Sequence, residues 1–121
     1  MAECPVFHSA DLIGKKWTLV LIQEIRLNGD KGFNAISRRM GKISPKLLSR
    51  RLKDLEDAGV IKKETSDGKA PFRTSYKLTK KGEDLNRIIT DLKRWNAKYH
   101  SRSDLDCMKK DCVKCTLYLK A

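Results

Sequence analysis

The segment "ISPKLLSRRLKDLEDAG", residues 43–59, constrains the fold more than any other stretch of the chain. Its apolar positions follow helical spacing and predict one buried face: Leu48, Leu52 and Leu55. Ser44 followed by Pro45 is a typical helix start, because the hydroxyl caps free N–H groups and proline fits the first turn. Gly59 is a natural C-terminal stop. The segment therefore predicts a helix that begins after Ser44.

A shorter helix is predicted directly before it. Phe33, Ile36 and Met40 have helical spacing, and Gly41 ends the pattern. Only a few residues then separate this helix from the one that Ser44 caps. Two short helices with so tight a connection form a helix-turn-helix pattern.

The charges of the second helix run against its dipole. Bases fill the first half and acids the second: Lys46, Arg50, Arg51 and Lys53, then Asp54, Glu56 and Asp57. The dipole favours the opposite order by about 0.3–1 kcal/mol per charge. The i,i+4 pairs also have the less favourable order, with the base first: Arg50 with Asp54, and Lys53 with Asp57. Such a helix is easier to explain if an anionic partner binds its N-terminal half.

The net charge favours the same kind of partner. The 121 residues include 27 Lys and Arg against 15 Asp and Glu, a formal charge of +12. This charge favours nucleic acid first and an anionic membrane surface second, with a solvated basic surface as the alternative. The longest uninterrupted apolar run is 19–22, far short of the ~20 residues of a membrane span. Residues 1–11 do not resemble a secretory signal, so we expect a cytoplasmic protein without a membrane partner.

The rest of the chain predicts an α+β fold that is mostly helical. Residues 7–27 form a short and a longer helix divided at Gly14, and Thr79 caps a long C-terminal helix. Residues 60–66 and 72–78 are strands of one antiparallel hairpin, which turns at 67–71. A basic hairpin directly after the second helix of a helix-turn-helix is a wing, so the fold class is a winged helix-turn-helix.

This frame indicates double-stranded DNA as the partner. In helix-turn-helix proteins the second helix enters the major groove with its N-terminal residues against base edges and phosphates. Arginine can pair with guanine, and lysine or serine can reach phosphates or bases. The candidate DNA-binding residues lie on both helices and on the hairpin: Arg38, Arg39, Ser44, Lys46, Ser49, Arg50, Lys53, Lys69 and Arg73.

Apolar residues also exceed what a small core needs. The C-terminal helix carries a long stripe that ends in two aromatic side chains, and the helix near Trp17 is apolar on several sides. We therefore expect a homodimer with these interface residues: Trp17, Leu21, Ile88, Leu92, Trp95 and Tyr99.

Four motifs, in order and spacing, resemble the HxlR-type winged-helix transcriptional regulators. They are "CPV…DLIGKKWTLVLI", "GFNAI", "ISPKLLSRRLKDLEDAGVI" and "YKLTKKGEDL…W". The resemblance implies a homodimer that binds a palindromic operator, with residues 1–100 as the DNA-binding and dimerisation domain. It also places Cys4 where some members have a thiol that senses electrophiles or oxidants, although an inert cysteine remains an alternative.

The tail, residues 101–121, departs from the family pattern because it carries Cys107, Cys112 and Cys115. Their C-x4-C-x2-C spacing equals that of the plant-type ferredoxin cluster run, so an iron–sulfur cluster completed by Cys4 is one reading. A zinc site completed by His100 is another. A thiol–disulfide switch and a tail without regulatory role also stay open.

The first function hypothesis is thus a sequence-specific DNA-binding regulator that responds to redox state or metal through its cysteines. The alternatives are an iron–sulfur or metal-binding redox protein and a non-specific architectural or RNA-binding protein. An enzyme is not expected, because the chain has no phosphate loop, paired-carboxylate cleft or nucleophile with an arranged base. A small-molecule or oxidant effector stays open.

Overall fold

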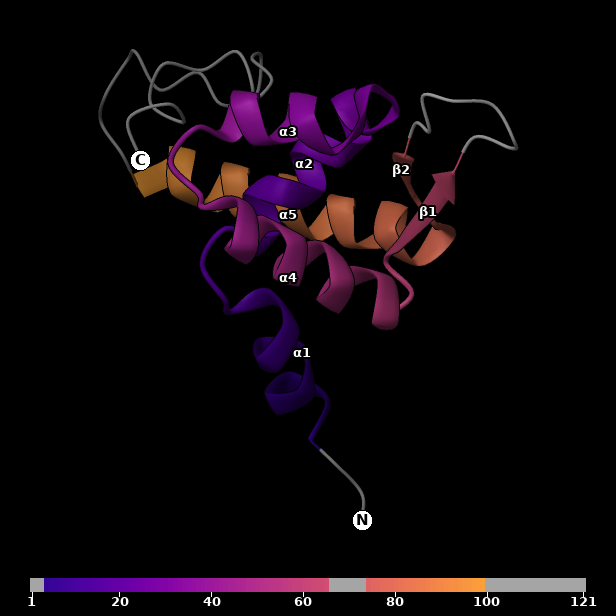
Figure 1. Ribbon diagram of the computed structural model, residues 1–121. Coiled ribbons are helices and arrows are strands. Elements are labelled where there is room, and N and C mark those ends of the chain that lie inside the picture. The colour runs from indigo at the N-terminus through magenta and orange to yellow at the C-terminus, as the bar shows by residue number, and fades with distance from the viewer. Residues whose placement is uncertain (1–3, 66–73, 100–121) are drawn as a thin grey trace.

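The structure is a computed structural model that describes residues 4–65 and 74–99 (Figure 1). In chain order these residues form α1 (Pro5–Ile13), α2 (Thr18–Asn28), the short 3-10 helix η1 (Gly29–Lys31), α3 (Gly32–Met40), α4 (Pro45–Asp57), β1 (Ile61–Thr65), β2 (Thr74–Leu78) and α5 (Lys80–Tyr99). This arrangement confirms the predicted fold class, a mostly helical chain with one antiparallel hairpin. Within the described ranges no helix combines the length and the apolar character that crossing a membrane requires.

The first two helices are separate, as Gly14 predicted. Gly14 ends α1, and Trp17 precedes α2 with a left-handed φ of 80°. A non-glycine residue in this region is strained, so its surroundings must hold it there. The half-buried Trp17 ring packs against the core, which supplies that support. None of the α1 residues is buried, and α1 projects away from the other helices in Figure 1.

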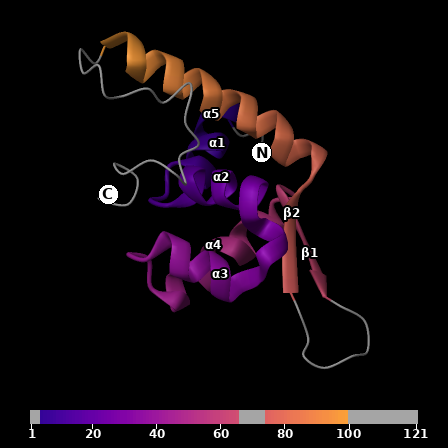
Figure 2. The same cartoon turned by 90° about the horizontal axis from the view of Figure 1, so that it is seen from above.

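A single hydrophobic core lies under α2, α3, α4 and the hairpin. Its buried members come from these elements, from the connections before α4 and β1, and from α5: Leu21, Ile22, Ile25, Ile36, Met40, Ile43, Leu48, Leu52, Leu55, Val60, Ile61, Tyr76, Leu78 and Ile89. The helix α2 lies between α5 and the α3–α4 pair, as Figure 2 shows. Gly29 allows η1 to approach the hairpin closely, because a Cβ there would overlap the backbone oxygen of Tyr76. The core therefore fixes the α3–α4 pair against both α2 and the hairpin.

The hairpin is shorter in the described residues than the sequence predicted. Its register pairs Ile61 with Leu78 and Thr65 with Thr74, so β1 and β2 are antiparallel. Tyr76 and Leu78 are buried, as the alternating pattern predicted. Burial raises the pKa of the Tyr76 hydroxyl, and the nearby Glu56 charge raises it further. The predicted turn and Phe72 lie outside the described residues.

Thr79 connects the start of α5 to the turn that follows α4. Its Oγ1 accepts a hydrogen bond from the Gly82 backbone N–H at 3.2 Å, which confirms the predicted cap. The same hydroxyl lies 2.5 Å from the Gly59 carbonyl oxygen, and Gly59 itself has a left-handed φ of 76°. The Thr79 backbone N–H donates to the Val60 oxygen at 3.0 Å. Thr79 therefore connects α5 by hydrogen bonds to the end of α4 and to the residue before β1.

Candidate nucleic-acid interface

The start of α4 is built as the sequence predicted. Ser44 Oγ accepts a hydrogen bond from the Leu47 backbone N–H at 3.1 Å, and Pro45 occupies the first turn. Gly41 ends α3 with a φ of 60°, so only residues 41–44 separate the two helices. Ser44 is thus placed at the turn, where its hydroxyl caps the helix.

The outer face of α4 carries polar side chains opposite its buried leucines. Lys46, Ser49, Arg50 and Lys53 are all exposed. Within residues 4–65 and 74–99, the side chains of Lys46, Ser49 and Arg50 have neither a hydrogen bond nor an ion pair. The two exposed cations near the helix N-terminus gain no stabilisation there from a carboxylate.

The acids of α4 stabilise the other half of the helix instead. Asp54 Oδ2 lies 3.5 Å from Lys15 Nζ and 3.4 Å from Arg51 Nη1. Arg51 Nε also donates to the Lys16 carbonyl oxygen at 3.4 Å. The sequence-based pairing of Asp54 with Arg50 is therefore corrected, because Asp54 binds Arg51 of its own helix and Lys15 of the α1–α2 connection. The exposed Lys53–Asp57 pair does form, at 3.4 Å.

The two candidate arginines of α3 differ. Arg38 is exposed, whereas Arg39 Nε donates to Glu24 Oε1 at 2.8 Å. Glu24 is fully buried on α2. Burial raises the pKa of the Glu24 carboxyl above its usual value, and the Arg39 charge and hydrogen bond oppose that shift. The sequence analysis did not select Glu24 as a site residue. The one available signal was that Glu24 is the single acid in an otherwise largely apolar helix.

The hairpin contributes a basic pair that the list of candidates also missed. Lys62 and Lys77 are direct cross-strand neighbours, and both are exposed. Like charges in this position destabilise a hairpin, by an amount within the roughly 0.2–1 kcal/mol range of such pairs. The sequence placed a lysine on each predicted strand, but the register that makes them neighbours comes from the structure. Lys69 and Arg73 lie outside the described residues.

A second unusual surface is apolar and lies on α5 and α1. On α5, Ile88 is 50% exposed, Trp95 61% and Tyr99 68%, and the last two rings meet edge to face at 6.2 Å. On α1, Val6 and Phe7 are exposed as well, although the sequence reading did not select them. These five residues form what we call the apolar surface.

The remaining predicted interface residues are less accessible. Trp17 and Leu92 are half-buried. Leu21 has no exposed surface and packs in the core of its own chain, so its assignment to a subunit interface is corrected. The helical spacing of Leu21 is the same for a residue that faces the core and one that faces a partner.

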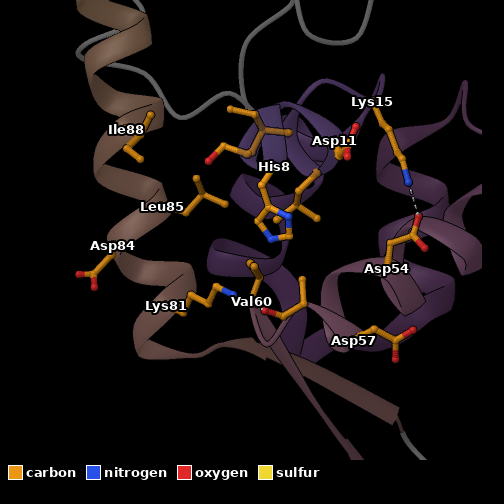
Figure 3. Close-up of a pocket in the computed structure, with 14 residues that line it drawn as sticks. His8, Asp11, Lys15, Asp54, Asp57, Val60, Lys81, Asp84, Leu85 and Ile88 are labelled. Atoms are coloured by element: carbon orange, nitrogen blue, oxygen red, sulfur yellow. Dashed lines mark hydrogen bonds and ion pairs between the residues drawn. The ribbon is translucent and has the colours of Figure 1, made fainter. Parts of the chain in front are cut away.

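An open groove separates α1 from α4 and α5 (Figure 3). It has a volume of about 760 Å³. Leu12, Val60 and Leu85 contribute apolar surface, while acidic and basic side chains such as Asp57 and Lys81 stand around them. Ile88 lines the groove and also belongs to the apolar surface, so the two features are continuous.

The cysteine predictions are only partly located. Cys4 is an exposed free thiol directly before α1. His100, Cys107, Cys112 and Cys115 lie outside the described residues, so the predicted cluster or zinc site does too. Among residues 4–65 and 74–99, no group of three or more His, Cys, Asp or Glu side chains could hold a metal ion.

Comparisons with known proteins agree with this geometry. The HxlR-like helix-turn-helix family model matches residues 12–104. The HTH-type transcriptional regulator YvaP of Bacillus subtilis is 35% identical over 104 residues, which cover 85% of this chain and 94% of YvaP.

Two solved structures are similar in both fold and sequence. The reduced form of the transcriptional regulator YodB from B. subtilis superposes with a TM-score of 0.70 at 30% identity, covering 83% of this chain and 97% of YodB. The oxidised form of the redox regulator HypR gives a TM-score of 0.70 at 30% identity, covering 82% of this chain and 100% of HypR. These relatives are regulators and not enzymes. The chain therefore belongs to the HxlR-like helix-turn-helix family of DNA-binding transcriptional regulators.

Proposed function

We propose that this chain acts as a homodimer that binds a palindromic operator with sequence specificity and responds to oxidants through its cysteine thiols. The observation that carries the DNA-binding part is the exposed outer face of α4. Lys46, Ser49 and Arg50 lie near the start of the second helix of a helix-turn-helix, and no described side chain pairs with them. That position meets base edges when such a helix enters the major groove.

Each side chain has a distinct chemical role in this proposal. Arg50 reads guanine through two parallel hydrogen bonds in the major groove, and Ser49 donates to or accepts from a neighbouring base or phosphate. Lys46 neutralises a phosphate near the helix N-terminus. Arg38, Lys62 and Lys77 add phosphate contacts that position the protein without reading sequence. Lys69 and Arg73 would extend these contacts along the wing.

The apolar surface on α1 and α5 supports the proposed dimer. A nine-residue helix without buried residues, such as α1, gains little stability by itself. A second copy that covers Phe7, Ile88 and Trp95 would supply the missing contacts through a self-complementary interface. The twofold axis of that dimer would place two α4 helices on inverted half-sites, which is why the operator is expected to be palindromic.

The oxidant response rests on Cys4 and on the relatives. Solved structures of YodB include a reduced and a diamide-treated form, and those of HypR include a reduced and an oxidised form. Cys4 is exposed before α1, so an oxidant can reach it. In the proposed step, two thiols lose their hydrogen atoms to diamide, a disulfide bond forms, and diamide becomes the hydrazine. Cys107, Cys112 and Cys115 are candidate partners for Cys4, and a metal bound by them is the other candidate for the sensor.

The test compares the duplex upstream of the protein's own gene with a scrambled duplex of the same composition, by fluorescence anisotropy at moderate salt. We expect the upstream duplex to bind at least about 10³-fold more tightly. Equal affinities that fall steeply with salt would favour the architectural alternative. Diamide should weaken or strengthen binding of the parent protein, and Cys4→Ser should abolish that change if Cys4 is the sensor. Metal analysis of protein purified without oxygen tests the cluster and zinc alternatives.

A further inference from the structure

A buried acid joins the DNA-binding helices to the core. Glu24 lies on α2, has no exposed surface, and accepts from Arg39 Nε at 2.8 Å. Its second oxygen, Oε2, is buried with no hydrogen-bond partner in the described residues. A buried carboxylate lowers the stability of the fold unless it is well paired. Replacing a buried ion pair by well-packed apolar side chains of similar volume often leaves stability unchanged or increases it. Packing alone therefore does not explain this pair.

Arg39 reaches from the core toward solvent. Its side chain is 37% exposed, although one of its nitrogens bonds a carboxylate that is completely buried. The guanidinium is a rigid planar fork of N–H donors, of which Glu24 takes one. The remaining donors are numerous enough for a bidentate contact with a phosphate. Because the fork is rigid, the bond to Nε fixes the direction in which the other donors point.

The location of Arg39 matches that chemistry. It lies in the last turn of α3, two residues before the turn that leads to α4. In helix-turn-helix complexes the first helix crosses the DNA backbone while the second enters the groove. A fixed guanidinium at this point would meet a phosphate as α4 enters the groove.

We propose that Glu24 is a positioning residue that orients the guanidinium of Arg39 for a bidentate contact with a phosphate of bound DNA. This inference rests on the DNA-binding function of the chain and adds a buried residue that does not touch DNA. Arg87 on α5 provides a matched comparison, because its side chain is exposed and lies outside the proposed DNA-binding face.

The test measures binding to a duplex of scrambled sequence over a range of salt concentrations, since a phosphate contact does not depend on sequence. In Glu24→Gln the amide keeps the size of the side chain but loses the charge. The variant is more positive than the parent, so simple electrostatics predicts equal or tighter binding. We expect weaker binding, and a plot of log affinity against log salt that is flatter by up to about 0.9, the contribution of one phosphate.

Two further variants separate positioning from a general structural role. Arg39→Gln removes the guanidinium and its charge and should show the full loss of slope, whereas Arg87→Gln on α5 should leave affinity within about twofold. Glu24→Gln added to Arg39→Gln should cause no further loss. Circular dichroism melting must show that each variant is folded. If Glu24→Gln does not fold, Glu24→Asp carries the same expectation, because it withdraws the carboxylate by one methylene.

Binding by the folded Glu24 variant that equals or exceeds the parent, with an unchanged salt slope, would overturn the proposal. So would additive effects of the Glu24 and Arg39 substitutions. If the parent protein does not bind DNA with sequence specificity, its affinities for the upstream and scrambled duplexes will be equal. The two failures are therefore distinguishable.

Discussion

The helices α4 and α5 each expose a set of side chains that the described part of the chain leaves uncovered. On α4 these side chains are cations, and on α5 they are large and apolar. On α5 two acids pair with arginines of the same helix: Asp84 Oδ1 lies 4.0 Å from Arg87 Nη1, and Asp91 Oδ1 lies 3.3 Å from Arg94 Nη1. The helix also exposes large apolar side chains, of which Trp95 is one. On α4 the apolar residues are well buried, and the unmatched groups are the cations near its start.

The difference indicates two kinds of partner. Unmatched cations at a helix N-terminus are stabilised by an anionic partner that also fits the dipole, which DNA supplies. An exposed apolar stripe is stabilised by another apolar surface, which a second copy supplies. The fold places the two faces on different helices, so the proposed dimerisation would leave the α4 face open to DNA.

The largest expected effect concerns the apolar surface. Trp95→Ala should weaken the dimer by about 2–4 kcal/mol, because large aromatic side chains dominate interfaces of this kind. Sedimentation velocity over a range of protein concentrations measures the change. Asn96→Ala, on the same turn of α5, is the control and should have little effect. An unchanged monomer–dimer equilibrium in Trp95→Ala would place the interface elsewhere.

The corresponding change on α4 is Arg50→Ala. It should cost about 1–3 kcal/mol on the upstream duplex and much less on the scrambled one, because the lost contact is to a base. Anisotropy titration of both duplexes gives the two values. Arg87→Ala removes the same charge from α5 and controls for net charge. Equal losses on both duplexes would make Arg50 a phosphate contact.

The caps of the two helices offer a smaller and purely structural comparison. Ser44→Ala removes one capping bond from α4 and should lower the free energy of unfolding by about 1 kcal/mol. Thr79→Ala should cost more, up to about 2 kcal/mol, because its hydroxyl also contacts the Gly59 and Val60 carbonyl oxygens. Urea unfolding measures both. A larger loss for Ser44→Ala would contradict this ranking.

The smallest expected change tests the hairpin. Lys62→Thr removes the like-charge pair with Lys77 and should raise the free energy of unfolding by a few tenths of a kcal/mol. If Lys62 contacts a phosphate, the same variant should bind the scrambled duplex with a salt slope lower by about 0.9. Urea unfolding and anisotropy supply the two readings. A hairpin variant that is less stable and binds DNA unchanged would contradict both expectations.

Local patterns predicted most of the fold. The spacing of Leu48, Leu52 and Leu55, the Ser44–Pro45 start and the Thr79 cap depend on neighbours in sequence, and the structure confirms each of them. These features need only helical periodicity and capping chemistry, both of which can be read from a single chain.

Long-range contacts account for what the sequence could not supply. The partner of Asp54 is Lys15, 39 residues away, so the local pairing with Arg50 was a poor guide. Leu21 faces the core because α2 is covered on several sides by the same chain. Glu24 and Arg39 meet only because α2 packs against α3. The functions of the candidate site residues, and the division at residue 100, stay predictions.

Hydroxyl-radical footprinting of the parent protein on the DNA upstream of its gene tests the central claim most directly. If a homodimer reads a palindrome with its two α4 helices, two protected regions should appear with inverted sequence. Their centres should lie about one helical turn apart, near 10 base pairs, or a multiple of that distance. Uniform protection, or a single protected region without an inverted partner, would contradict the proposed mode of binding.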